Sequence, residues 1–304
     1  MKNPEIRFVM NQNIDRTKWD QCIKSSTGPQ IYASSDYLDL ISPTWDGLVC
    51  DDYRFVMPLI VRQKLKMFFL LQPIFGQQHG IFPNAPYEIQ TAFLTYIQSH
   101  YSYIAIHLNT AHIPPFPKEF KVTECQNLVL QLNADYPEIR SQYSKHACRQ
   151  IKKTISQNIS VVKGILPDEY IRLKNLATAH KLQRKSMRTL LQLIEYGYKT
   201  GTGTIYGAYD ETNILCAAAF FLNDGRRVTY LNAASTAEGK QNSSMYQIID
   251  TFIRKHAGLP LTLDFEGSSI LGIARFYKGF GAKEEIYYAL KMNRLPIPFR
   301  WIKK

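Results

Sequence analysis

The most informative stretch of the sequence is 261–282, which reads Leu261-Thr262-Leu263-Asp264-Phe265-Glu266-Gly267-Ser268-Ser269, continued by Ile270-Leu271-Gly272-Ile273-Ala274-Arg275-Phe276-Tyr277-Lys278-Gly279-Phe280-Gly281-Ala282. The pattern predicts a strand over 261–265, and strand alternation places Asp264 and Glu266 on one face and Phe265 on the other. A Gly-Ser loop follows, then a helix over 270–278 and a last strand over 285–292. This order of elements is typical of an α/β domain.

The second half of the chain has a meander of strands upstream of this block. We predict helices over 168–179 and 185–199, strands over 204–209, 214–222 and 227–233, a polar loop at 235–243, and a helix over 244–256. Asn223-Asp224-Gly225 is a strong hairpin signal. The order predicts an α/β fold with a mixed, mainly antiparallel sheet. It excludes a Rossmann fold, which alternates strand and helix from its start.

The first half repeats the order of helices, strands, helix and strand. Helices are predicted over 16–25, 34–41 and 87–99, and strands over 48–50, 53–61, 67–71, 103–107 and 127–132. Because 304 residues exceed the usual size of one domain, we expect two tandem domains, 1–133 and 134–304.

A basic helical stretch at 135–157 opens the second domain. Arg149, Lys152 and Lys153 are spaced three and four residues apart, so they share one helix face. This face is either a solvated surface or a contact for a phosphate-bearing substrate.

Composition limits the partners and the compartment. Lys and Arg outnumber Asp and Glu by 37 to 25, which gives a net charge of +12. Such a charge favours a phosphorylated cofactor, tRNA or the anionic surface of a membrane as a partner, although solubility alone also accounts for it. The five cysteines form no CxxC pair, so neither a zinc site nor a disulfide framework is expected. No apolar signal segment opens the chain, and basic residues interrupt the most apolar stretch, 55–71, so we expect a reduced, cytoplasmic protein.

The block at 261–282 resembles a known family. Strand, loop and helix followed by Tyr277-x-x-x-Gly281 resemble the last conserved block of GNAT acyltransferases. The acidic strand end, Glu266-Gly267-Ser268 and the string at 276–281 are similar to the Fem-type aminoacyltransferases. Residues 72–80 and 45–58 resemble the matching segments of the first domain of that family. The resemblance implies two tandem GNAT-like domains, and its better-preserved motifs lie in the second.

The family implies a loop that presents backbone amides to the phosphates of the donor at a helix N-terminus. Here that loop is 236–244, and the candidate donor-binding residues are Thr236, Gly239, Lys240, Gln241, Asn242 and Ser243. GNATs that use CoA commonly carry the pattern Gln/Arg-x-x-Gly-x-Gly/Ala in this loop. This chain has Thr236 at the first position of the pattern and Gln241 at the last. Fem-type enzymes that use aminoacyl-tRNA often carry a lysine where this chain has Tyr277. Acyl-CoA and aminoacyl-tRNA therefore both remain candidate donors, and no tightly bound cofactor is expected.

Tyr277 and Glu266 are the candidate catalytic residues. A phenol at position 277 donates a proton to the leaving group or a hydrogen bond to the tetrahedral intermediate, unless it only packs the helix on the sheet. Glu266, at the end of a strand, is placed to receive the proton of the amine. Further candidates, for substrate binding, are Tyr230, Asn232, Ser268, Arg275, Lys278, Gln78 and His79. A solvated helix face is the other interpretation of Arg275 and Lys278, and a structural role that of His79.

These residues predict an N-acyltransferase that transfers an acyl or aminoacyl group to an amine acceptor, for example on a cell-envelope precursor. Direct attack by the amine needs no metal and no covalent enzyme intermediate. The alternative is a non-catalytic binding protein on a degenerate GNAT scaffold, which the altered donor loop favours. A nucleic-acid-binding protein has only the positive charge in its support. The sequence does not determine the oligomeric state.

Overall fold

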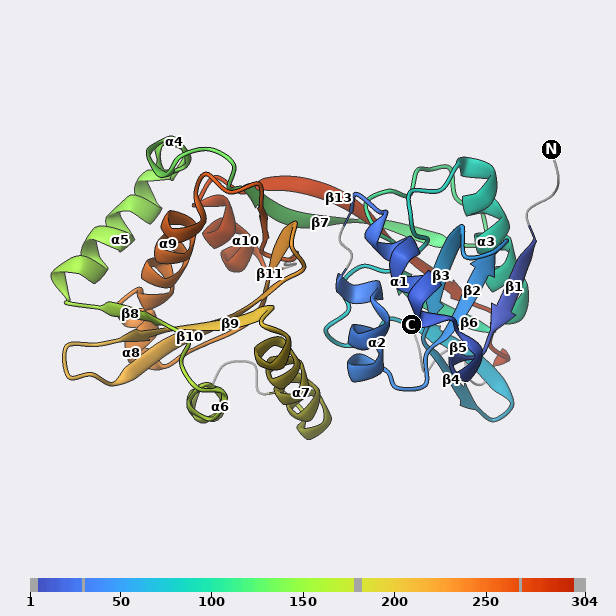
Figure 1. The fold of residues 1–304 in the computed structure, drawn as a ribbon, viewed down its shortest axis with the longest axis horizontal. Helices are drawn as coiled ribbons and strands as arrows, with labels where there is room; N and C mark the ends of the chain where they lie inside the picture. Colours follow the sequence, from blue (N-terminus) through green and yellow to red (C-terminus); the bar gives the residue numbers. More distant parts are fainter. Residues whose placement is uncertain (1–4, 29–30, 178–181, 268–269, 298–304) are drawn as a thin grey trace. The chain divides into compact units, whose positions relative to one another are not determined.

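The computed structural model describes residues 5–28, 31–177, 182–267 and 270–297 (Figure 1). The chain divides into two compact units, Met1–Cys125 with Ile286–Lys304, and Gln126–Glu285. This division differs from the predicted domains 1–133 and 134–304. Strand β13 (Lys283–Asn293) pairs with β6 (Tyr103–His107), with Ala289 opposite His107, so the end of the chain belongs to the first unit.

The first unit holds two sheets with helices packed on them. In one sheet the strand order is β1-β2-β3, and in the other β4-β5-β6 is followed by β13. Trp19 and Trp45, with ring centroids 4.8 Å apart, belong to one of its hydrophobic clusters. Its elements are β1 (Ile6–Val9), α1 (Arg16–Lys24), α2 (Ser35–Ile41), β2 (Asp46–Cys50), β3 (Phe55–Leu59), β4 (Val61–Lys64), β5 (Met67–Leu71), α3 (Tyr87–His100) and β6, with short 3-10 helices at Asn11–Asn13 and Ile31–Ala33.

The second unit is one mixed sheet with helices on both faces. Its strand order is β7-β12-β11-β10-β9-β8, antiparallel except for the parallel pair β11 and β12. Figure 1 shows α5 and α9 on one side of the meander and α6 and α7 on the other. Its elements are β7 (Lys121–Gln131), α4 (Tyr136–Ser141), α5 (Lys145–Ser156), β8 (Ser160–Lys163), α6 (Pro167–Leu176), α7 (Arg184–Thr200), β9 (Gly203–Tyr209), β10 (Leu215–Asn223), β11 (Arg227–Ser235), α8 (Ala237–Gln241), α9 (Ser244–His256), β12 (Thr262–Asp264) and α10 (Leu271–Lys278).

Several predicted elements need correction. The single strand predicted over 53–61 is two strands in different sheets, because β3 pairs with β2 whereas β4 pairs with β5. The predicted helix 135–157 is broken at Ser144, whose side chain accepts a hydrogen bond from the Ala147 amide and starts α5. The predicted loop 235–243 contains the short helix α8. Strands β1 and β8 were not predicted.

Strands β11 and β12 part after a short paired stretch. Their parallel register runs only from Arg227 opposite Thr262 to Thr229 opposite Asp264. Strand β11 continues to Ser235, paired on its other side with β10. A bulge at Leu231, between the pairs Phe220–Asn232 and Phe221–Tyr230, bends β11 at this point. Among the described strands, residues 230–235 therefore have no partner on the side of β12.

No helix in the described part of the chain is both long and apolar enough to cross a membrane.

Candidate functional site

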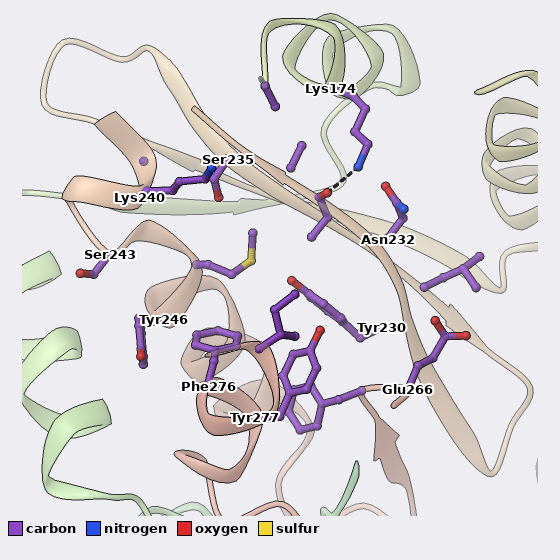
Figure 2. A pocket seen from close by; sticks show the side chains of 18 of the residues that line it. Lys174, Tyr230, Asn232, Ser235, Lys240, Ser243, Tyr246, Glu266, Phe276 and Tyr277 are labelled. Atoms are coloured by element: carbon purple, nitrogen blue, oxygen red, sulfur yellow. Dashed lines mark hydrogen bonds between the residues drawn. The ribbon is translucent and has the colours of Figure 1, made fainter. Parts of the chain in front are cut away.

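A pocket of about 500 Å³ lies in the second unit where β11 and β12 part. Ligand-binding clefts commonly have this size. Its walls come from α6, β11, α8, α9, residues 265–267 and α10 (Figure 2). The lining residues are Lys174, Ala177, Tyr230, Leu231, Asn232, Ala233, Ala234, Ser235, Gly239, Lys240, Ser243, Met245, Tyr246, Phe265, Glu266, Gly267, Ile273, Phe276 and Tyr277.

Helix α10 presents Tyr277 to this pocket. Ile273, Phe276 and Tyr277 line the pocket at spacings of three and four residues, which is one helix face. Arg275 and Lys278 are exposed and do not line it. Lys278 instead forms an ion pair with Glu284. The structure thus brings Tyr277 to the candidate site and leaves the two basic residues of the same helix outside it.

Tyr277 and Tyr230 lie together in the middle of the pocket (Figure 2). Their ring centroids are 5.8 Å apart and nearly perpendicular, and Tyr277 stacks on Phe265 at 4.7 Å. Burial raises the pKa of both phenols, and the charge of Glu266 raises the pKa of Tyr277 further. Both hydroxyls are therefore protonated at neutral pH and available as hydrogen-bond donors.

Glu266 lies at one end of the pocket, away from Lys240 and Ser243 (Figure 2). The predicted shared face of Asp264 and Glu266 is wrong, because β12 ends at Asp264 and Glu266 has a left-handed backbone with φ of 56°. Its amide donates to Asp264 Oδ1 at 2.8 Å. Asp264 itself is fully buried, accepts a 2.7 Å bond from Arg227 Nη1 and does not line the pocket. Only one of the two carboxylates faces the candidate site.

Lys174 and Asn232 lie along another wall. Lys174 Nζ donates to the Ala233 carbonyl at 2.8 Å, and burial lowers the pKa of this lysine. Asn232 Oδ1 accepts a 2.7 Å bond from the hydroxyl of Tyr170, which is fully buried. Tyr230 and Asn232 line one pocket as predicted. Lys174 is not among the site residues predicted from the sequence. Its spacing of four residues from Tyr170, on a helix with a buried face, is the sequence signal that places it towards the sheet.

The predicted donor loop forms α8, and several of its backbone amides donate hydrogen bonds to groups within the same loop. The side chain of Thr236 caps the helix by accepting from the Gly239 amide at 3.1 Å, and the Lys240 amide donates to the Thr236 carbonyl. The amides of Asn242 and Ser243 also donate to carbonyls within the segment. Of the six predicted donor-binding residues, Gly239, Lys240 and Ser243 line the pocket, whereas Thr236, Gln241 and Asn242 do not.

Gln78 and His79 belong to the first unit and do not line this pocket. Both are buried, and His79 Nε2 lies 3.1 Å from the Tyr32 carbonyl. Burial lowers the pKa of His79 to about 4. Ser268 lies outside the described residues. Within the described ranges, no three His, Cys, Asp or Glu side chains are grouped so that they could hold a metal ion.

The fold matches solved structures, although neither a protein-family model nor a curated protein matches the sequence. FemX is 11% identical with a TM-score of 0.65, over 99% of this chain and 100% of its own. A tandem GNAT protein from the clavulanic acid biosynthesis pathway is 12% identical with a TM-score of 0.55, over 96% of this chain and 99% of its own. The C-terminal domain of a putative lysylphosphatidylglycerol synthetase from Agrobacterium fabrum is 9% identical with a TM-score of 0.59, over 96% of this chain and 95% of its own. The chain therefore has a Fem- and GNAT-like acyltransferase fold made of two tandem domains.

Proposed function

We propose that the protein is an N-acyltransferase that moves an acyl or aminoacyl group from acyl-CoA or aminoacyl-tRNA to an amine. The proposal is carried by one observation: the pocket opens where β11 and β12 part, and the protonated phenols of Tyr230 and Tyr277 lie inside it. The fold similarity supports it. An amine of a cell-envelope precursor is the proposed acceptor, which rests on the Fem resemblance alone.

The proposed reaction is direct attack of the amine nitrogen on the donor carbonyl carbon. A C–N bond forms, the C–O or C–S bond to the carrier breaks, and the proton lost by the amine ends on the leaving group. Glu266 receives the amine proton and returns it to the leaving oxygen or sulfur. The return is either direct, with Tyr277 donating a hydrogen bond to the oxyanion, or by way of Tyr277, which protonates the leaving group and is reprotonated by Glu266. Peptide groups of β11 on its unpaired side hold the donor in extended form.

The hydrogen bonds of α8 bear on which donor the protein uses. A CoA pyrophosphate placed on this segment would compete with the bonds from the Gly239 and Lys240 amides to Thr236. Breaking them would open the helix and release its cap, which costs about 1 kcal/mol. The bonds within α8 therefore weigh against a CoA pyrophosphate at this position, and they do not bear on aminoacyl-tRNA.

The test is a panel of acyl-CoAs and aminoacyl-tRNAs with amine acceptors, followed by mass spectrometry of the products and thermal shift of the protein. Tyr277→Phe should lower kcat by roughly 100-fold or more and leave the melting temperature nearly unchanged, because only the hydroxyl is lost. Tyr246→Phe is the matched control, since Tyr246 lines the same pocket farther from Glu266 and should keep its turnover (Figure 2). Donor binding without turnover in the wild-type protein would support the non-catalytic binding protein. No donor binding at all would overturn the proposal.

A further inference from the structure

Lys174 is a half-buried cation on the pocket wall that lacks an acidic partner among the described residues. Its ammonium donates to the Ala233 carbonyl, which is polar but carries no charge. Glu169, on the same helix, accepts a bond from the Tyr209 hydroxyl at 2.7 Å. The other titratable groups that line the pocket are Glu266, Lys240 and the phenols of Tyr230, Tyr246 and Tyr277.

A lysine at this place is costly for folding. Removing an ammonium from water without a counter-charge is unfavourable, and burial accordingly lowers the pKa of Lys174. The neighbouring positions on α6, Tyr170 and Leu173, are fully buried, so an apolar residue would suit this face. A cation that the fold does not neutralise is a candidate for binding a charge that a ligand supplies.

Asn232 lines the pocket near Lys174, and its side-chain oxygen is on the side of the lysine (Figure 2). Because Tyr170 donates to Asn232 Oδ1, the amide is oriented with its NH2 group free of that bond. Lys174 is fixed on the carbonyl of the next residue, Ala233. The pocket is thus lined by one ammonium and one amide NH2, held from two different elements, and both are donor types that bind oxygen anions.

We propose that Lys174 and Asn232 bind an anionic oxygen group of the substrate, a carboxylate or a phosphate, inside the pocket. The anion sets which end of the substrate enters the space between β11 and β12, so Lys174 and Asn232 determine specificity and Tyr170 positions Asn232. This inference names the charge of the substrate and rests on the proposed function.

The test is equilibrium binding of small anions, followed by NMR of the Asn232 side-chain amide and the Ala233 and Ala234 backbone amides. The probes are alanine, alaninamide, inorganic phosphate and pyrophosphate. Shifts with alanine but not with alaninamide or phosphate identify a carboxylate site, and shifts with the phosphates but not with alanine identify a phosphate site. No perturbation by any anion overturns the inference.

The variants separate binding from structure. Lys174→Met should lower the affinity for the anion about tenfold or more, because a hydrogen bond to a charged group is lost. Lys174→Arg keeps the charge and should keep most of the affinity. Tyr170→Phe should weaken binding less than Lys174→Met does. A merely structural lysine predicts the opposite pattern: Lys174→Met lowers the melting temperature and leaves anion binding unchanged, which overturns the inference.

The proposal of an anion site and the proposal of group transfer can be contradicted independently of each other. Tyr277→Phe should lower kcat for transfer by roughly 100-fold or more and retain anion binding, since the proposed anion contacts are Lys174 and Asn232. If the anion binds and no donor is ever turned over, the proposed function falls and the anion site stands. If transfer is found and Lys174→Met changes neither KM nor kcat, the anion site falls and the proposed function stands.

Discussion

At the scale of single residues, Gly239 shows how one position of the donor loop is used for packing. A Cβ built on Gly239 would lie 2.1 Å from the Cys216 carbonyl oxygen, a backbone atom of β10. Glycine is therefore required by the close approach of α8 to the sheet. The sequence resemblance assigned the same glycine to the donor phosphates, and the geometry supplies a second, sufficient reason for it.

We predict that Gly239→Ala destabilises the protein by about 1–3 kcal/mol, because the new methyl group forces α8 away from β10. Gly272→Ala is the matched control: Gly272 lies on the exposed start of α10, where a Cβ meets nothing within 4 Å. That change should be neutral or stabilising by up to about 1 kcal/mol, as expected for alanine in a helix. Urea unfolding of both variants measures the difference, and equal stabilities would contradict the predicted contact.

At the scale of elements, one ion cluster holds β11 and β12 together at their paired end. Arg227, at the start of β11, contacts Asp264 Oδ2 at 2.7 Å and Glu285 Oε2 at 3.1 Å. Asn127 of β7 donates to the same Asp264 oxygen at 3.2 Å. Burial raises the pKa of Asp264 although Arg227 opposes this shift. The cluster fixes the strands at one end, so the pocket opens only beyond it.

We predict that Arg227→Met destabilises the protein by about 3–5 kcal/mol, because it leaves the buried Asp264 carboxylate without its cation. Lys278→Met breaks the exposed pair with Glu284 and should cost no more than about 1 kcal/mol. Chemical denaturation followed by circular dichroism compares the two. Similar losses in both variants would show that burial does not distinguish these ion pairs.

The strands that the sequence predicts well are apolar runs that are buried over most of their length, and the helix predicted well follows a recognisable motif. The strands 204–209, 214–222 and 227–233 correspond to β9, β10 and β11, and the helix over 270–278 to α10. Strand β8 was missed because three of its four residues are exposed and its pattern resembles a polar loop. The pocket position of Tyr277 followed from its motif. The role of Lys174 did not, because it depends on the strand against which α6 packs, and no local pattern encodes that choice.

At the scale of the whole chain, the last strand of the sequence belongs to the first unit. The halves of the sequence repeat the same order of elements, which is why two domains are predictable. The boundary is not, because β13 pairs with β6, far earlier in the chain, and residues 286–304 join the first unit. Local periodicity identifies a strand but carries no information on its partner across such a distance.

The stability of the first unit should depend on pH through its histidines. Two of them, His79 and His112, are buried, and burial also lowers the pKa of the partly buried His107. Burial lowers the pKa of both His79 and His112 to about 4. His112 Nε2 accepts a bond from the Ile81 amide while Nδ1 faces Asn109 Oδ1, and His79 presents Nε2 to the Tyr32 carbonyl and Nδ1 to the Gln72 amide nitrogen. Each ring thus has one acceptor nitrogen facing a donor, an arrangement that only the neutral imidazole satisfies.

Because the pKa of a histidine in an unfolded chain is about 6.5, unfolding between pH 6.5 and pH 4 takes up protons. The stabilisation from neutral burial is therefore complete above pH 6.5 and is lost as the pH falls towards 4. For two histidines, the free energy of unfolding should fall by up to about 2.7 kcal/mol per pH unit in this window.

Urea titrations at pH 7, 6 and 5, followed by tryptophan fluorescence, measure this fall, since Trp19 and Trp45 are buried in this unit. His79→Gln should reduce the slope by up to about 1.4 kcal/mol per pH unit, and replacement of the exposed His100 should leave it unchanged. A wild-type stability that stays constant from pH 7 to pH 5 would mean that the two rings are not held neutral by the fold.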